Sequence, residues 1–151
     1  MLRLAATACA LTFAAHGAWA QDWLTVQGFP ETPQDDLVEV NPARQDEGQQ
    51  VTVLLRVSRK EMRTSFKGHR YRSYLGKAVI DCTVQQGWYL VNRYYQQPLW
   101  AGPETAQESF RPGEAPVAFK DMPGDAARKI VQAACKGKDQ SRDQGKDRAK
   151  P

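Results

Sequence analysis

Apolar and polar residues alternate from Val51 to Ser58, which is the two-residue period of a half-buried β-strand. The apolar positions of this segment are Val51, Val53, Leu55 and Val57. A shorter run, residues 37–40, precedes an Asn-Pro turn and also has the composition of a strand. The pattern therefore predicts two strands in the first half of the chain, and the four apolar residues of the longer strand are expected to face a core.

A hairpin is predicted after the longer strand, with its turn at residues 67–70 (Lys-Gly-His-Arg). The return strand covers residues 71–84. Its side chains should point alternately to the inner and the outer face of the sheet. The inward set is Tyr74, Ala78, Ile80, Cys82 and Val84, and the outward set is Tyr71, Ser73, Lys77, Asp81 and Thr83. A turn at 85–87 then leads to a strand at 88–96. Residues 102–116 are expected to be irregular, and residues 117–119 to form a short strand.

A C-terminal helix is predicted from apolar residues that recur at helical spacing, namely Ala126, Ile130, Val131, Ala134 and Cys135. Asp121 is expected to cap its N-terminus, and Pro123 is tolerated in a first turn. Asp125 suits the positive end of the helix dipole. Gly137 is expected to end the helix.

The first twenty residues have the features of a secretory signal peptide. Arg3 precedes an apolar stretch that runs from Leu4 to Ala15, and Ala18-Trp19-Ala20 supplies the small side chains that a signal peptidase accepts. The stretch is shorter than the roughly 20 residues that cross a bilayer, and no later segment is apolar enough to do so. We therefore expect a signal peptide at 1–20 and an exported protein that resides in the periplasm, at the cell surface or outside the cell.

The last residues, 138–151, are rich in charge and contain no aromatic residue and no aliphatic residue larger than alanine. Such a segment cannot bury enough apolar surface to offset the entropy lost on ordering. We therefore expect one domain at 21–137 and a disordered charged tail at 138–151.

Removal of the signal peptide would also remove Cys9, which leaves Cys82 and Cys135. Cys9 itself is not a credible lipidation site, because no hydrophobic region precedes it and alanine stands where a lipid-attachment motif normally has leucine. Two thiols in an oxidising compartment most simply pair with each other. Their bond would join the apolar stripe of the helix to the inward face of the sheet. A metal site is not expected, since His69 is the one histidine after residue 20 and no Cys-x-x-Cys spacing occurs.

Charge is segregated within the body of the chain. Seven acids accompany one base between residues 22 and 47, whereas eight bases accompany one acid, Glu61, between residues 56 and 77. Such asymmetry can mark a surface that binds a polyanion. It is also typical of an acidic segment that packs beside a basic hairpin, or of an edge strand charged against aggregation. We favour these two structural interpretations, and the binding surface stays open.

Several segments together resemble the surface-adhesin E family of Gram-negative bacteria, over nearly all of the body but not the tail. The shared elements are Trp23, the strand 51–57, Tyr71-Arg72-Ser73, Val79-Ile80-Asp81-Cys82, the strand 88–95, Phe110-Arg111-Pro112-Gly113, Met122-Pro123 and Ala133-Ala134-Cys135. The resemblance implies an antiparallel sheet of about six strands with a C-terminal helix tied to its concave side by a disulfide. Together with the pattern above, it predicts an α+β fold: an antiparallel sheet of five or six strands with a C-terminal helix packed on one face.

The resemblance also implies a function, because the family's namesake is an adhesin that engages host matrix and serum proteins such as vitronectin and laminin. That namesake is held at the surface by a lipid anchor, and this chain lacks the motif for one. A shared fold alone does not transfer a function. The resemblance therefore implies a binding protein whose compartment stays open.

The first functional hypothesis is accordingly an exported, non-enzymatic binding protein of the cell envelope. Its partner would be a host or envelope protein, or a polyanion, contacted by cations that are interleaved with Phe66 and Tyr71. These cations are Arg56, Arg59, Lys60, Arg63, Lys67, Arg70 and Arg72. We expect neither a cofactor nor a nucleic-acid partner.

Two alternatives are weaker. An enzyme would need a positioned base, yet His69 lies among cations in a turn, and Ser65 and Ser73 lack an elbow motif and an orienting group. The acidic pairs at 35–36 and 46–47 lie in loops. A structural or assembly role would use the aromatic residues Trp88, Tyr89, Tyr94, Tyr95 and Trp100 as a contact surface. Such crowding is more often part of a core.

Overall fold

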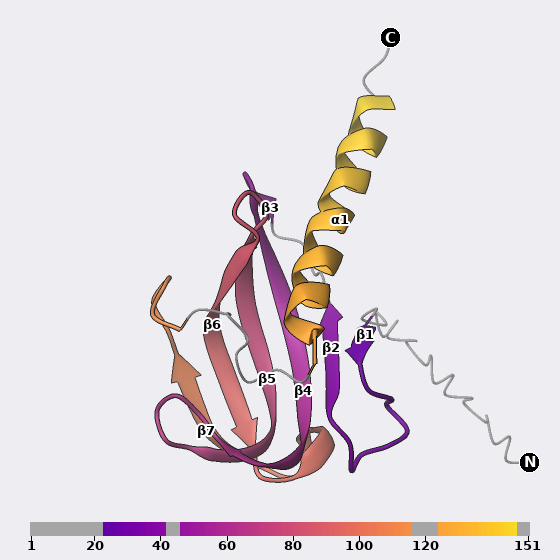
Figure 1. Ribbon diagram of the computed structural model, residues 1–151. Coiled ribbons are helices and arrows are strands. Elements are labelled where there is room, and N and C mark those ends of the chain that lie inside the picture. The colour runs from indigo at the N-terminus through magenta and orange to yellow at the C-terminus, as the bar shows by residue number, and fades with distance from the viewer. Residues whose placement is uncertain (1–22, 42–45, 116–123, 148–151) are drawn as a thin grey trace, which may run out of the picture.

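The computed structural model describes residues 23–41, 46–115 and 124–147 as an antiparallel sheet with a helix across one face (Figure 1). The elements are β1 (Leu24–Gln27), β2 (Leu37–Asn41), β3 (Asp46–Glu47), β4 (Gln50–Thr64), β5 (Arg70–Asp81), β6 (Gln86–Tyr95), the 3-10 helix η1 (Pro98–Trp100), β7 (Glu104–Ser109) and α1 (Ala126–Asp147). The strand order is β1-β2-β4-β5-β6-β7, and the two-residue β3 pairs with β4 off this path. The predicted α+β fold is confirmed.

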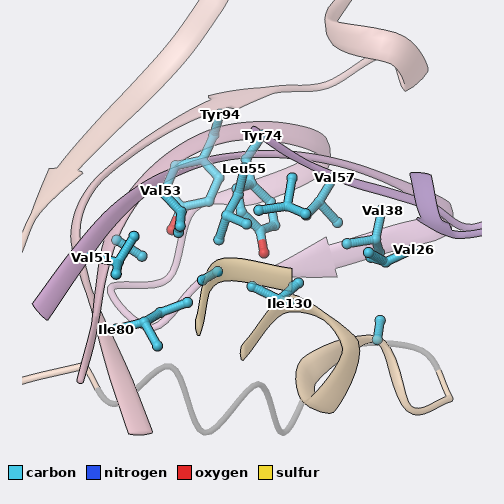
Figure 2. Packing of buried hydrophobic residues seen from close by; sticks show 14 of the residues in the cluster. Val26, Val38, Val51, Val53, Leu55, Val57, Tyr74, Ile80, Tyr94 and Ile130 are labelled. Atoms are coloured by element: carbon cyan, nitrogen blue, oxygen red, sulfur yellow. The ribbon is translucent and has the colours of Figure 1, made fainter. Parts of the chain in front are cut away.

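The core lies between the sheet and α1 (Figure 2). The inward positions of β4 are the predicted ones, since Val51, Val53, Leu55 and Val57 are all buried. From α1 come Ala126, Ile130 and Ala134, which are spaced by four residues and therefore lie on one face of the helix. In Figure 2, Ile130 lies across from the valines of the sheet.

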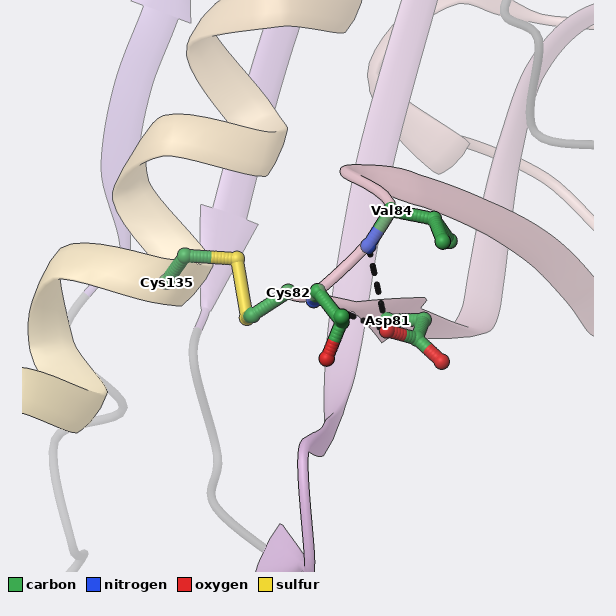
Figure 3. The surroundings of a disulfide bond; sticks show 5 residues. Asp81, Cys82, Val84 and Cys135 are labelled. Atoms are coloured by element: carbon green, nitrogen blue, oxygen red, sulfur yellow. Dashed lines mark hydrogen bonds between the residues drawn. A yellow bond between two sulfur atoms is a disulfide. The ribbon is translucent and has the colours of Figure 1, made fainter.

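The Cys82–Cys135 disulfide ties α1 to the turn that follows β5 (Figure 3). The Asp81 carboxylate shapes this turn by accepting hydrogen bonds from the amides of Thr83 (2.8 Å) and Val84 (3.4 Å). The two cysteines are 53 residues apart in sequence, so in the chain-entropy model their bond contributes about 4 kcal/mol to stability. The predicted pairing is confirmed.

The predicted faces of the return strand are partly wrong. Tyr71 and Ser73 were expected to face solvent, but both are buried, whereas Val84 was expected inside and is exposed. Tyr71 lies beyond a register shift in the pairing of β4 with β5, and a two-residue period does not hold across such an irregularity. Ser73 is covered by η1: its hydroxyl donates to the carbonyl of Gln97 (2.6 Å) and accepts from the amide of Trp100 (3.0 Å). Val84 lies in a turn, because β5 ends at Asp81.

The segment 104–109 is also a correction, because it forms the edge strand β7 where irregular structure was predicted. Its sequence, Glu-Thr-Ala-Gln-Glu-Ser, has no apolar alternation and few β-branched or aromatic residues. Pairing with β6, in which Asn92 faces Glu108 and Tyr94 faces Ala106, supplies the ladder that local propensity does not predict.

The two ends of α1 differ from each other in how well they were predicted. Asp125 directly precedes the helix, and its carboxylate pairs with Arg128 (2.7 Å) and Lys129 (3.0 Å), whose hydrogen bonds lower the pKa of Asp125. The prediction that Gly137 ends the helix is wrong, because α1 continues to Asp147 and takes in residues for which disorder was predicted. A glycine inside a helix costs only about 1 kcal/mol, and the lysine, glutamine and arginine that follow are good helix formers.

Several predictions fall on residues outside the described ranges. They are the signal peptide at 1–20, the cap at Asp121, the proline at 123 and the short strand at 117–119. In the part of the chain that the structure describes, no helix is both long and apolar enough to cross a membrane.

Candidate functional site

The candidate site is a bent hairpin formed by residues 59–72, which we call the arm. It begins where the pairing of β4 with β5 shifts register between Ser58 and Arg63, and such irregularities let paired strands bend. In Figure 1 the turn of the arm curls below the sheet and comes to lie beside β7. The turn is closed by the amide of Ser65, which donates to the carbonyl of His69 (2.8 Å). Gly68 has a φ of 92°, a conformation that favours glycine.

A buried carboxylate on β7 holds the arm in this position. Glu108 is only 2% exposed. It accepts hydrogen bonds from the hydroxyl of Ser65 and from the amide of Lys67 (3.3 Å), both in the turn of the arm. The ammonium group of Lys67 adds a bond to the carbonyl of Ser109 (2.9 Å). Since a buried carboxylate is costly without partners, these donors fix the arm against β7.

Tyr94 on β6 completes the surroundings of Glu108. Its hydroxyl donates to the second carboxylate oxygen (3.0 Å) and accepts from the side-chain amide of Asn92 (3.3 Å). Burial raises the pKa of the Tyr94 hydroxyl, and the negative charge of Glu108 raises it further, so the group remains a donor at neutral pH. Glu108 is not among the predicted site residues, because no local signal distinguishes it within a segment predicted to be irregular.

Two of the seven predicted partner-binding cations are engaged in ion pairs within the fold. Arg56 pairs with the buried Glu39 (2.8 Å), and its guanidinium lies over the rings of Trp23 (4.1 Å) and Trp100 (4.8 Å). Arg59 is 5% exposed and lies 3.3 Å from the carboxylate of Asp36. Both acids belong to the acidic first segment, so this segment does pack beside the basic hairpin. The structural interpretation of the charge pattern therefore applies to Arg56 and Arg59.

The other five cations lie along the arm with more of their surface free. Arg72 is half-buried and donates to the carbonyl of Arg59 (2.9 Å). The exposed members are Lys60, Arg63, Lys67 and Arg70. Within the described residues, the side chains of Lys60, Arg63 and Arg70 make no ion pair. The arm thus presents uncompensated positive charge to solvent.

The groups considered for catalysis have structural contacts instead. Ser65 donates to Glu108, and its oxygen accepts from the amide of His69 (2.9 Å), so its hydroxyl proton is not directed at the imidazole. The Nε2 atom of His69 lies 3.9 Å from a carboxylate oxygen of Glu108, and the His69 side chain is exposed to solvent. Ser73 is buried under η1. Among the residues described, no group of three His, Cys, Asp or Glu side chains could hold a metal ion.

The aromatic residues considered for assembly are largely internal. Tyr94 is buried, and the hydroxyl of Tyr89 lies 2.7 Å from that of Tyr74 in the core. The indole of Trp100 donates to the carbonyl of Tyr74 (2.9 Å). Trp88 and Tyr95 are half-buried. The cluster therefore belongs mainly to the packing of the sheet.

Comparison with known proteins gives one result that bears on function. No curated protein and no solved structure matches the chain significantly. The family model described as surface-adhesin protein E matches residues 23–136, which include the arm, β7 and both cysteines of the disulfide. Because this match covers most of the chain, the protein belongs to the surface-adhesin protein E family.

Proposed function

We propose that this protein is an exported, non-enzymatic binding protein of the cell envelope that binds host matrix or serum proteins through the arm. The single observation that carries the proposal is the set of exposed cations on the arm, Lys60, Arg63 and Arg70, which have no acidic partner in the described part of the chain. An adhesin family supplies the class of function, and the arm supplies the surface.

The arm suits binding because its backbone is held in place before a partner arrives. Glu108 and Lys67 bind the turn to β7, so little entropy is lost there on association. The exposed cations can then contact acidic side chains or sulfated groups of a partner. Each such contact at an exposed surface is worth about 0.2–1 kcal/mol, so three of them together change an affinity by about 3-fold to 150-fold.

The proposal is tested by measuring binding of the exported protein to immobilised vitronectin and laminin at several salt concentrations. The arm variant is Lys60→Gln, Arg63→Gln and Arg70→Gln combined. We expect it to bind at least about threefold more weakly than the unchanged protein, with a smaller dependence on salt.

The charged C-terminal segment is the obvious confounder, and it also provides a matched control. Lys138→Gln, Arg142→Gln and Lys146→Gln combined remove the same number of charges outside the arm. This control is expected to bind as the unchanged protein does. An equal loss of binding in both variants would show that the effect comes from net charge alone. It would contradict the proposal that the arm is the binding surface.

A further inference from the structure

We infer that the tip of the arm also docks on anionic lipid surfaces, with Phe66 inserted among the lipids and the neighbouring cations on the headgroup phosphates. This inference rests on the proposed function only in taking the arm as a binding surface. It adds a partner of a different chemistry. It concerns the most exposed apolar residue of the arm, which acidic protein partners leave unexplained.

Phe66 occupies the turn of the arm and is 75% exposed. Its ring forms an edge-to-face pair with that of Phe110, with 6.5 Å between the ring centroids. Met62, on the same arm, is 39% exposed. A large apolar side chain that is exposed to this extent is available to an external apolar phase.

Cations flank this apolar residue along the turn. Arg63 and Arg70 lie at either end of the turn, since Arg63 pairs with Tyr71 and Thr64 with Arg70 in the ladder. Lys67 directly follows Phe66, and its ammonium group lies 5.0 Å from the centre of the Phe110 ring. A single acid, Glu61, occurs in the arm. Basic residues around an aromatic tip are the combination that binds the interface of a membrane with negative headgroups.

A lipid surface fits this tip better than a protein partner does. A projecting phenylalanine needs a complementary pocket on a folded protein, whereas a bilayer deforms around it. The turn is held to β7 through Glu108, so the ring projects from a fixed base rather than from a loose loop. Each arginine or lysine near an anionic surface strengthens binding about fivefold, and insertion of one phenylalanine about tenfold or more.

The experiment measures sedimentation of the full exported chain with vesicles of phosphatidylcholine containing 30% phosphatidylglycerol, and with vesicles of phosphatidylcholine alone. The test variant is Phe66→Ser. The matched control is Phe29→Ser, because Phe29 is 70% exposed in the loop between β1 and β2 and does not belong to the arm. We expect binding to the anionic vesicles only, about tenfold weaker for Phe66→Ser and unchanged for Phe29→Ser. Phe66→Trp should bind at least as tightly as the unchanged protein, since tryptophan favours the interface.

Three results would overturn the inference. One is absence of binding to anionic vesicles. Another is equal binding by Phe66→Ser and the unchanged protein, which would make the arm a purely electrostatic surface for polyanions or acidic proteins. The third is an equal loss in the Phe29 control. Failure of the proposed function is distinguishable, because it is read from immobilised vitronectin and laminin and from the arm variant, neither of which depends on Phe66.

Discussion

The hydroxyl of Tyr94 on β6 donates a hydrogen bond to the carboxylate of Glu108 on β7 at 3.0 Å, in a buried site. The same carboxylate accepts from Ser65, 43 residues earlier in the chain, and so joins the turn of the arm to the edge of the sheet. The exposed cations supply the charge of the binding surface that we propose, and this polar contact inside the protein sets where they lie.

Replacing Glu108 by alanine should destabilise both the fold and the arm. The change leaves the Tyr94 hydroxyl, the Ser65 hydroxyl and the Lys67 amide without their acceptor, so we expect a loss of about 3 kcal/mol in the free energy of unfolding. Urea denaturation measures this loss. Hydrogen exchange should also show faster exchange of the amides of Lys67 and His69, since both are bonded within this site.

Glu104→Ala is the matched control for the Glu108 variant, because Glu104 lies on the same strand with its side chain exposed, 3.8 Å from Arg93. It should change stability by no more than about 0.5 kcal/mol. A Glu108→Ala protein as stable as this control would show that the buried carboxylate does not hold the arm.

Removing the disulfide should have the largest effect of the changes considered. Cys82→Ala combined with Cys135→Ala frees the turn after β5 from α1, and the chain-entropy model gives a loss of about 4 kcal/mol. Thermal unfolding followed by circular dichroism should show a Tm lower by about 15–30 °C. The unchanged protein should move to a similar Tm on reduction, whereas the double variant should not respond to the reductant. A response of the double variant would mean that the reductant acts elsewhere.

The sequence predicted those features in which one local pattern or one chemical rule is sufficient. The alternation of Val51, Val53, Leu55 and Val57 was recognisable because one face of β4 is buried along that whole segment. The pairing of Cys82 with Cys135 followed from an exported chain with two remaining thiols.

What the sequence did not predict depends on contacts between distant segments. The burial of Tyr71 follows from the bend of the arm, and the role of Glu108 from three donors on two other segments, the turn of the arm and β6. The strand β7 forms because β6 pairs with it, although its residues have little preference for a strand. The cations of the hairpin looked alike in sequence, and only the positions of Glu39 and Asp36 separate Arg56 and Arg59 from the exposed members.

Arg56 provides a test of this separation. Arg56→Met retains much of the apolar contact with Trp23 and Trp100 but leaves the buried carboxylate of Glu39 without its cation. We expect a loss of about 2–4 kcal/mol in the free energy of unfolding, since an uncompensated buried charge is costly. Adding Glu39→Gln should recover part of this loss, which a double-mutant cycle measures. Arg63→Met, on the exposed arm, should change stability by less than about 0.5 kcal/mol. Equal losses at the two positions would contradict the division into structural and exposed cations.

Stability should fall at alkaline pH because of the buried tyrosines. Burial raises the pKa of Tyr74 and of Tyr94 above the ordinary value of 10.0, with the neighbouring Tyr89 adding to the shift at Tyr74. As the pH rises, the unfolded chain therefore releases these protons before the folded chain does. The contribution of the two tyrosines to the free energy of unfolding is complete below about pH 10 and is lost as the pH rises above it. In that range each group lowers the free energy of unfolding by about 1.4 kcal/mol per pH unit. Urea denaturation between pH 9 and 11.5 measures this slope. Tyr94→Phe should reduce the slope by one such contribution. A slope that is unchanged in Tyr94→Phe would show that Tyr94 titrates alike in the folded and unfolded chain.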